Sequence, residues 1–189
     1  RKARRAEIVE AAVRAIHRHG PAVSMNDVAA EAEVSKPVLY RHFADQADLY
    51  HEVGRWAARW LVRWLAQHLE PGDEPREVVA AVVDAYLGAI ETEPRLYRFV
   101  VRYAFADSTS PDSVDGYRAV VAEHVARVLR ARLDDDHAAA AQAWAHGLAG
   151  LVQSVGDWWL DNPEAATRAQ LADQLTSLIW AGVAGSLRR

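Results

Sequence analysis

The chain has 189 residues, of which 51% are hydrophobic and 25% are charged, a composition typical of a globular protein with a sizeable core. It contains no cysteine, which excludes disulfide bonds and thiolate metal sites. No run of about 18 uncharged apolar residues predicts a transmembrane helix, and the first residues lack the apolar core of a signal peptide. We therefore expect a soluble cytoplasmic protein with no membrane partner.

The formal net charge of −4 is unevenly distributed along the chain. Residues 1–45 hold eight Lys and Arg against six Asp and Glu, a net charge of +2, which leaves −6 for residues 46–189. Four of the basic residues lie within the first five. The N-terminal end is therefore either a flexible basic arm that contacts phosphate groups or a solvated tail.

The first elements in chain order are three short predicted helices. Apolar residues recur with helical spacing from about Arg4 to His19, and Gly20 and Pro21 end this helix. In the segment 24–43, a serine precedes each of two further short helices and is placed to cap it. Two short helices joined by a tight turn can present the second helix to the major groove of DNA.

Longer helices are expected to fill the rest of the chain, and no segment alternates as a β-strand does. Prolines suit the start of two of these helices, and Asn162-Pro163 separates the last two. The predicted helices cover residues 46–69, 75–93, 94–105, a stretch ending near 133 after a loop at 106–115, then 137–160 and 164–187. The expected fold is all-α with about nine helices.

The helix-turn-helix segment resembles the TetR (tetracycline-repressor-like) family of transcriptional regulators. The matching residues follow the family's order and spacing: Ile8-Val9-Glu10-Ala11-Ala12, Gly20, Ser24, Asp27-Val28-Ala29, Ala32, Val34-Ser35, Leu39-Tyr40-Arg41-His42-Phe43 and Leu49. The resemblance implies a DNA-binding domain over 1–45 and a helical ligand-binding and dimerisation domain over 46–189. It covers about 50 residues closely, and the remainder only in the number of helices and in two long terminal helices.

Two residues depart from the family's pattern. Glu33 stands where the family usually has a glycine in the turn, and we expect it to adopt a left-handed conformation at a cost of about 1 kcal/mol. Gln46 replaces a lysine that touches phosphate in the family, so one contact to the DNA backbone is in doubt.

The predicted DNA-binding residues lie in and around the third helix. Lys36 is its first exposed side chain and the best candidate for a base or phosphate contact, whereas Leu39 and Phe43 are expected in the core. Arg41 either reaches phosphate or pairs with acidic residues between helices. The set is Ser24, Ser35, Lys36, Pro37, Val38, Tyr40, Arg41 and His42, with Arg4 from the first helix. Tyr40 and His42 resemble the family's backbone-contacting pair, and Pro37 and Val38 offer apolar contact to thymine methyl groups.

Aromatic residues of the longer helices are the candidates for an effector pocket. Three tryptophans follow one another at intervals of four residues, so they lie along one face of the fourth helix. By resemblance the pocket would bind an apolar or aromatic small molecule, although the same side chains could simply fill the core. The predicted ligand-binding residues are Trp56, Trp60, Trp64, Tyr86, Tyr103, Trp144 and His146, with Asp84, His124 and Gln153 as further polar groups.

The last two helices are the predicted dimer interface. By resemblance, two helices from each of two chains form a four-helix interface; the alternative is that they pack only within one chain. The interface residues are predicted to be Leu148, Leu151, Val155, Leu175, Leu178 and Ile179. A two-fold dimer would read both halves of a palindromic operator.

The function predicted from the sequence is a ligand-responsive transcriptional regulator, most simply a repressor that an effector releases from DNA by shifting the fourth helix. The alternatives are a helical ligand-binding or adaptor protein with weak or lost DNA binding, and a helical enzyme. The sequence has no Gly-rich phosphate loop, no G-x-S-x-G motif, and no metal-ligand spacing among its eight histidines. We therefore predict no catalytic residue, metal ion or cofactor.

Overall fold

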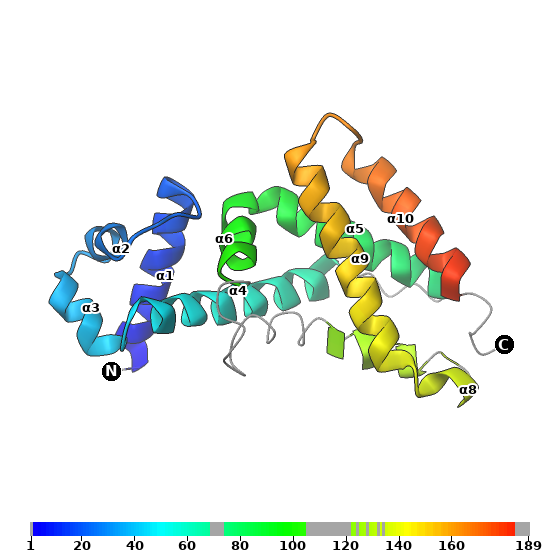
Figure 1. Ribbon diagram of the computed structural model, residues 1–189, viewed down its shortest axis with the longest axis horizontal. Coiled ribbons are helices and arrows are strands. Elements are labelled where there is room, and N and C mark those ends of the chain that lie inside the picture. The colour runs from blue at the N-terminus through cyan, green and yellow to red at the C-terminus, as the bar shows by residue number, and fades with distance from the viewer. Residues whose placement is uncertain are drawn as a thin grey trace. The chain divides into compact units, whose positions relative to one another are not determined.

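The computed structural model describes residues 2–68, 74–104, 122–123, 125–127, 129–131, 133 and 135–183. Every regular element in these residues is a helix, which confirms the predicted all-α fold (Figure 1). The helices are α1 (Lys2–His19), α2 (Met25–Glu31), α3 (Lys36–His42), α4 (Gln46–His68), α5 (Pro75–Thr92), α6 (Pro94–Ala104), α8 (Asp135–Ala138), α9 (Ala141–Asp161) and α10 (Arg168–Val183). Within these ranges, none of the helices is long and apolar enough to cross a membrane.

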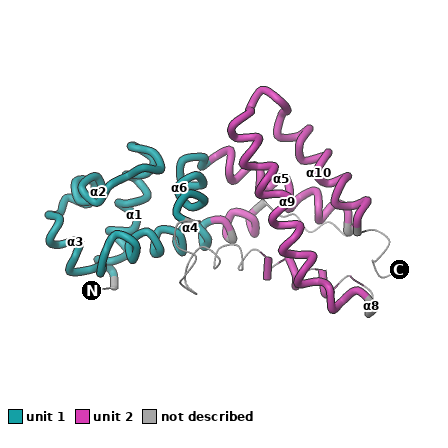
Figure 2. The backbone as a smooth tube through the Cα atoms, viewed as in Figure 1, with its two compact units in different colours: residues 1–60, 93–117 teal, residues 61–92, 118–189 magenta. Residues whose placement is uncertain are grey.

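The chain divides into two compact units (Figure 2). Unit 1 comprises residues 1–60 and 93–117, and unit 2 comprises residues 61–92 and 118–189. The division falls inside α4, whereas the domain boundary predicted from sequence lies near residue 45. Unit 1 therefore holds the first three helices together with the start of α4 and with α6.

Unit 1 is built around one apolar core to which α1, α2, α3, α4 and α6 all contribute. Leu39 of α3 is completely buried, and Phe43 just after it is 1% exposed, as predicted. On α6, apolar side chains such as Phe99 are buried while its arginines are exposed. The rings of Tyr50, Phe99 and Tyr103 form a cluster with centroids 4.5–4.9 Å apart. Helix α6 is thereby packed onto α4, and it also packs against α1.

Unit 2 is organised around α5, which packs against α9 and α10. Gly156 of α9 lies so close to α5 that a Cβ there would be 2.8 Å from the Ile90 side chain, so only glycine fits without a shift. Arg168 of α10 forms ion pairs with Asp84 and Glu91 of α5, at 3.0 and 3.1 Å. The helices α9 and α10 run in opposite directions (Figure 1).

Several predicted helix ends are corrected by the structure. The chain is helical from Lys2, so the described basic residues near the N-terminus do not form a flexible arm. Helix α9 begins at Ala141, not near residue 137, and α10 spans Arg168–Val183 in place of 164–187. The predicted loop 106–115 lies entirely outside the described residues, as does about half of the helix predicted to end near 133.

Candidate nucleic-acid interface

Helix α2 begins with a complete capping box. The Ser24 hydroxyl accepts a hydrogen bond from the backbone N–H of Asp27, and the Asp27 carboxylate accepts one from the backbone N–H of Ser24 at 2.8 Å. The hydroxyl of Ser24 also donates to that carboxylate, and these hydrogen bonds lower the pKa of Asp27. The side chain of Ser24, a predicted DNA contact, is thus already engaged within the protein, although it remains exposed.

The turn between α2 and α3 is closed by Glu33 in a left-handed conformation, with a φ of 53°. The backbone N–H groups of Glu33 and Val34 donate to the carbonyl oxygens of Ala30 and Ala29, at 3.2 and 3.0 Å. The structure therefore bears out the conformation expected where a glutamate replaces the usual glycine. The carboxylate of Glu33 is exposed, a few residues before the first turn of α3.

Helix α3 has one face turned to solvent and one face anchored in the core. Leu39 is the anchor, and Phe43 ends the helix by donating its backbone N–H to the carbonyl oxygen of Leu39. The N-terminal Ser35 has the extended backbone of a capping residue but makes no side-chain cap hydrogen bond. The exposed residues of the segment are Ser35, Lys36, Pro37, Tyr40 and Arg41, whereas Val38 and His42 are half-buried.

The polar side chains on that solvent face are available to a ligand. Neither Lys36 nor Arg41 forms an ion pair with another described residue, so the alternative in which Arg41 pairs between helices has no support here. Tyr40 is 45% exposed, which is unusual for so large an aromatic side chain. The Nδ1 atom of His42 is buried without a hydrogen-bond partner among the described residues. An exposed helix with two unpaired cations and a free phenol is suited to phosphate and base contacts.

The end of α3 is joined to α1 and α4 by Arg5, a residue that sequence reasoning did not single out. Its guanidinium donates to the carbonyl oxygen of His42, to Asp48 at 2.6 Å and to Glu52 at 3.1 Å. It also lies over the ring of Phe43, 4.3 Å from the centroid. No local pattern could have revealed this role, because the partners of Arg5 lie 37–47 residues further along the chain.

The electrostatics of this cluster favour its charged forms. Burial acts to raise the pKa values of Asp48 and Glu52. Hydrogen bonds from Arg5 and the Ala44 backbone to Asp48, and from Arg55 and Arg5 to Glu52, outweigh burial, so both pKa values lie below the ordinary range. The pKa of Arg5 is raised, chiefly by its hydrogen bond to Asp48. The three groups therefore remain ionised, and the cluster stays intact, at neutral pH.

The side chain of Gln46 is exposed at the start of α4 but is hydrogen-bonded within unit 1. Its side-chain amide donates to the Tyr50 hydroxyl at 2.5 Å, and that hydroxyl donates in turn to the carbonyl oxygen of Val23. Burial raises the pKa of Tyr50 to about 12, so the phenol is a stable donor at neutral pH. Through Tyr50, the Gln46 side chain is thereby linked to Val23, just before α2.

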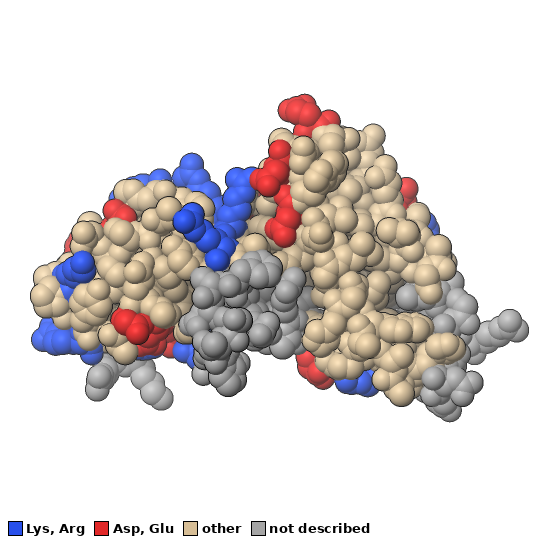
Figure 3. All heavy atoms as spheres, in the orientation of Figure 1, with Lys and Arg blue, Asp and Glu red and all other residues tan. Residues whose placement is uncertain are grey.

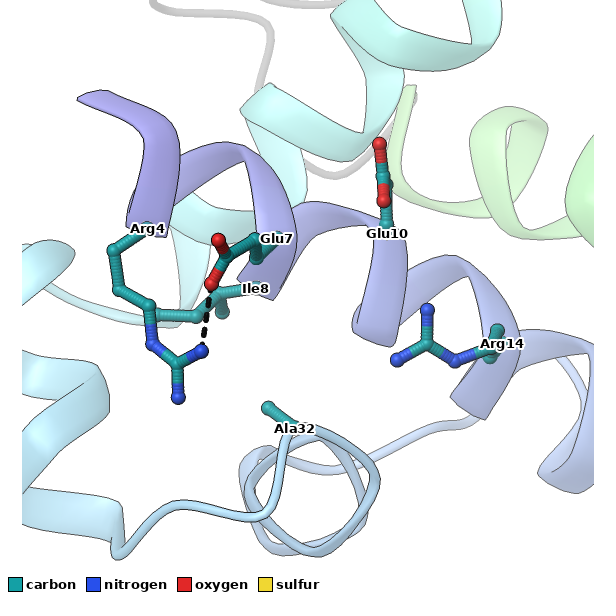
Figure 4. Close-up of a pocket in the computed structure, with 6 residues that line it drawn as sticks. All are labelled: Arg4, Glu7, Ile8, Glu10, Arg14 and Ala32. Atoms are coloured by element: carbon teal, nitrogen blue, oxygen red, sulfur yellow. Dashed lines mark hydrogen bonds and ion pairs between the residues drawn. The ribbon is translucent and has the colours of Figure 1, made fainter.

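Arg4 lies on an exposed face of α1 and forms an ion pair with Glu7 at 2.6 Å. Both side chains line a surface pocket of about 230 Å³ at the α1 surface beside the end of α2 (Figure 4). The pocket is lined by Arg4, Glu7, Ile8, Glu10, Arg14 and Ala32. Its two arginines and two glutamates balance one another, and none of the predicted effector residues lines it.

Much of the basic charge of unit 1 is paired. Arg14 and Arg18 of α1 share Glu31 of α2, at 3.1 and 2.7 Å. On the face drawn in Figure 3, the basic side chains of unit 1 form separate groups with acidic side chains between them. On this face the basic residues of unit 1 therefore do not form one continuous positively charged surface.

Comparison with known proteins decides the family. A family model described as "Bacterial regulatory proteins, tetR family" matches residues 8–53, and one described as "Tetracyclin repressor-like, C-terminal domain" matches residues 64–189. The chain belongs to the TetR family of transcriptional regulators. The resemblance inferred from the first 50 residues is thereby confirmed and extended over the second half.

Relatives of this TetR-family regulator match it over most of its length. An uncharacterized HTH-type transcriptional regulator of Mycobacterium tuberculosis, Rv0472c, is 32% identical over 96% of this chain and 78% of its own. The HTH-type transcriptional activator FasR of Mycolicibacterium smegmatis is 26% identical over 86% of this chain and 74% of its own. A crystal structure of a TetR-like transcriptional regulator from Rhodococcus sp. RHA1 shares 27% identity and a TM-score of 0.69, covering 98% of both chains.

The predicted effector residues of the TetR-family chain are distributed over both units. In unit 1, Trp56 and Tyr103 pack against the core, and Trp60 is half-buried. In unit 2, Trp64 donates its indole N–H to the carbonyl oxygen of Ala85 at 2.9 Å, and Tyr86 is 8% exposed.

The remaining candidates are found at other places in unit 2. The ring of Trp144 lies 5.6 Å from that of His137, and His146 is exposed on α9. Asp84 is paired with Arg168, Gln153 is half-buried, and His124 lies outside the described residues. The role of all these residues in effector binding stays a prediction.

The predicted dimer residues of this regulator differ in exposure. Leu175 and Ile179 of α10 are 4% and 5% exposed, while Leu178 is 60% exposed. On α9, Leu148, Leu151 and Val155 are half-buried. Sequence reasoning missed Trp158, which is 52% exposed on α9 and is adjacent in sequence to the buried Trp159.

Proposed function

We propose that this TetR-family chain is a ligand-responsive repressor that binds a palindromic operator as a homodimer in the cytoplasm. The observation that carries the proposal is α3, where Leu39 anchors the helix and Lys36, Tyr40 and Arg41 are left exposed. An exposed helix that follows a capped helix and a tight turn fits the major groove, with its N-terminal residues toward the bases.

The homodimer is supported by two large exposed hydrophobic side chains in unit 2, Trp158 on α9 and Leu178 on α10. Each of these side chains would be covered if α9 and α10 packed against the same two helices of a second chain. One helix-turn-helix reads only a few base pairs, whereas a two-fold dimer reads two half-sites about one helical turn of DNA apart.

Release by an apolar or aromatic effector is proposed from the family and from the aromatic residues of α4–α9. An effector that shifts α4 would change the spacing of the two recognition helices, so that both could no longer dock at once. Effector and operator affinities must then be reciprocally coupled. Mass spectrometry of a co-purified ligand, followed by titration of the operator complex, tests this step; an effector with equal affinity for free and DNA-bound protein contradicts it.

DNA binding itself is tested by two substitutions on the exposed face of α3. We expect Lys36→Ala and Tyr40→Phe each to weaken binding to the DNA upstream of the gene, by roughly 1–3 kcal/mol for a base contact and by less for a phosphate contact. A mobility-shift titration measures the effect. Because both side chains are exposed, the thermal unfolding midpoint should not fall.

The matched control is Arg63→Ala, which removes one exposed positive charge from α4 in unit 2. It should leave operator affinity within about twofold of the wild type. If neither Lys36→Ala nor Tyr40→Phe differs from this control, the assignment of α3 as the recognition helix is wrong.

A second candidate function is an adaptor with weak DNA binding, and the engaged side chain of Gln46 favours it because that residue replaces a phosphate-contacting lysine. A repressor should bind the upstream DNA with an affinity that falls steeply as salt rises, since phosphate contacts release counterions. An adaptor should bind the upstream DNA weakly or not at all, without this steep dependence on salt. The direction of regulation is a separate question, because FasR is named as an activator; a reporter gene with and without the protein answers it.

A further inference from the structure

The guanidinium of Arg5 makes five hydrogen bonds to groups of the protein, which a side chain that only contacts a DNA phosphate would not require. Its Nε donates to Glu52 at 3.2 Å, its Nη1 donates to Asp48 at 3.3 Å and to the carbonyl oxygen of His42, and its Nη2 donates to Asp48 at 2.6 Å and to Glu52 at 3.1 Å. All three nitrogens are therefore engaged with groups of the protein. The side chain is 30% exposed, so its partners and the Phe43 ring cover most of it.

The partners of Arg5 belong to the two elements whose relative direction matters for DNA reading. His42 is the last residue of α3, so its carbonyl oxygen has no acceptor role inside the helix. Asp48 lies in the first turn of α4 and also accepts the backbone N–H of Ala44, at 2.9 Å, from the link between the helices. One guanidinium thus joins α1 to the end of α3 and to the start of α4.

We propose that Arg5 is a positioning residue, which fixes the direction of α3 relative to α4 through the His42 carbonyl oxygen and the Asp48 carboxylate. This inference rests on the proposed DNA-binding function. Arg5 does not itself contact DNA; it holds the recognition helix where its exposed side chains meet the base edges. The planar fork of an arginine presents its N–H donors in a fixed geometry to a carbonyl oxygen and two carboxylates, whereas the compact ammonium group of a lysine, on a flexible stem, does not hold them in that geometry.

The proposal separates two components of DNA affinity. Binding to DNA of unrelated sequence requires only cations near phosphate groups, whereas binding to an operator requires base contacts at a fixed orientation. Loosening α3 therefore lowers specific affinity while leaving non-specific affinity and the salt dependence unchanged. Loss of a phosphate contact has a different effect. It weakens both specific and non-specific binding, and it reduces the salt slope by about 0.9 per phosphate.

The experiment compares Arg5→Gln, Arg5→Lys and Asp48→Asn in the full chain, with Arg4→Gln as the matched control. Dissociation constants are measured for the upstream DNA and for a shuffled sequence at several salt concentrations. For Arg5→Gln and Asp48→Asn we expect the ratio of specific to non-specific affinity to fall at least tenfold, with an unchanged salt slope. The double variant Arg5→Gln/Asp48→Asn should lose no more than either single variant, because both disrupt one unit.

Two results would overturn the proposal. If Arg5→Gln weakens both kinds of binding and reduces the salt slope as Arg4→Gln is expected to do, and if Arg5→Lys restores them, then Arg5 is a phosphate contact. If all three variants keep the wild-type ratio, then Arg5 has no positioning role. The thermal unfolding midpoint of each variant, followed by circular dichroism, shows that it is folded, and Asp48→Asn tests the same unit with Arg5 in place.

A different result would contradict the proposed DNA-binding function itself. The wild-type protein would then show no preference for the upstream DNA over the shuffled sequence. A wild-type preference that survives in Arg4→Gln but is lost in Arg5→Gln and Asp48→Asn supports both the function and the role of Arg5.

Discussion

Glu33 is a single residue at which chain geometry and DNA binding meet. Its φ of 53° lies in the left-handed region, which a residue with a Cβ adopts only at a cost, whereas glycine adopts it freely. Its carboxylate is also exposed just before the recognition helix, where DNA phosphates would approach. The residue is therefore unfavourable for both folding and binding.

Replacing Glu33 by glycine should stabilise the protein by about 1 kcal/mol, because the left-handed backbone is then no longer strained. Chemical denaturation measures the free energy of unfolding. The control is Glu33→Gln, which removes the charge but keeps the Cβ. We expect Glu33→Gln to leave stability unchanged and to share with Glu33→Gly any gain in operator affinity; equal stabilisation by both variants would mean that charge, and not backbone strain, is the cause.

The Arg5 cluster predicts how stability depends on pH. The pKa values of Asp48 and Glu52 are lowered in the folded protein. Their contribution to stability is therefore fully present above the unfolded-state pKa of about 4 and is lost as the pH falls through the lower folded-state values. The wild-type protein should lose part of its stability below about pH 4.

The measurement is urea denaturation between pH 7 and pH 3 for the wild type and for Asp48→Asn/Glu52→Gln. The variant lacks both titrating groups, so the difference in unfolding free energy between the two proteins should narrow as the pH falls. Parallel curves over the whole range would show that these two carboxylates do not contribute to acid sensitivity.

Residues whose roles could be predicted from the sequence interact mainly with near neighbours in the chain, whereas the others interact with residues far away in the sequence. The left-handed conformation of Glu33 was predictable because the family that the segment resembles usually has a glycine at this position of the turn. Burial of Leu39 and Phe43 followed from helical periodicity. The role of Arg5 was not predictable, since its partners lie 37–47 residues further along the chain, at the end of α3 and near the start of α4. Gln46 likewise differed from the family pattern without any local indication that Tyr50 would bind it.

At the scale of elements, the helix ends in the first half of the chain were predicted well because local signals define them. Gly20 has a φ of 85° and follows α1, and Ser24 forms the capping box of α2. Ser35 occupies the N-cap position of α3, but its side chain makes no capping hydrogen bond. A correctly predicted cap position therefore does not imply that the capping hydrogen bond forms. Where the apolar periodicity extends past the end of a helix, the capping residues determine where the helix ends.

The start of α10 illustrates that point in the second half of the chain. The side-chain amide oxygen of Gln170 accepts the backbone N–H of Thr167 at 3.0 Å, and the Thr167 hydroxyl accepts the backbone N–H of Gln170 at 3.3 Å. This reciprocal pair starts the helix at Arg168, although the sequence is compatible with helix from residue 164. The Thr-x-x-Gln spacing was visible in the sequence and would have corrected the prediction. Helix α9 offers no such signal, because its cap residue, Ala140, has no side-chain acceptor.

At the scale of the whole molecule, family membership rests on both halves of the chain, while the proposed homodimer rests on unit 2. Leu175 and Ile179 are buried within the chain, whereas Leu178 on the same helix is exposed. Helix α10 thus has one face packed against its own unit and, on another face, an apolar side chain, Leu178, that no described residue buries. The sequence predicted all three leucine and isoleucine residues as interface, because periodicity alone does not tell an intrachain face from an interchain face.

Leu178→Glu should therefore convert the proposed homodimer into a monomer. A carboxylate at this position would be buried without a partner in a dimer but solvated in a monomer, which favours dissociation. Sedimentation equilibrium measures the association, and a mobility-shift titration measures operator binding, which should weaken because a monomer reads one half-site only. Since Leu178 is 60% exposed within the chain, the fold itself should tolerate the change.

The matched control is Ala66→Glu, which adds the same charge at an exposed position of α4 in unit 2. It should leave both association and DNA binding unchanged. If Leu178→Glu sediments as the wild type does, α10 does not form the interface through this residue. If it becomes monomeric yet keeps full operator affinity, reading of a palindrome by a two-fold dimer is not how this protein binds its DNA.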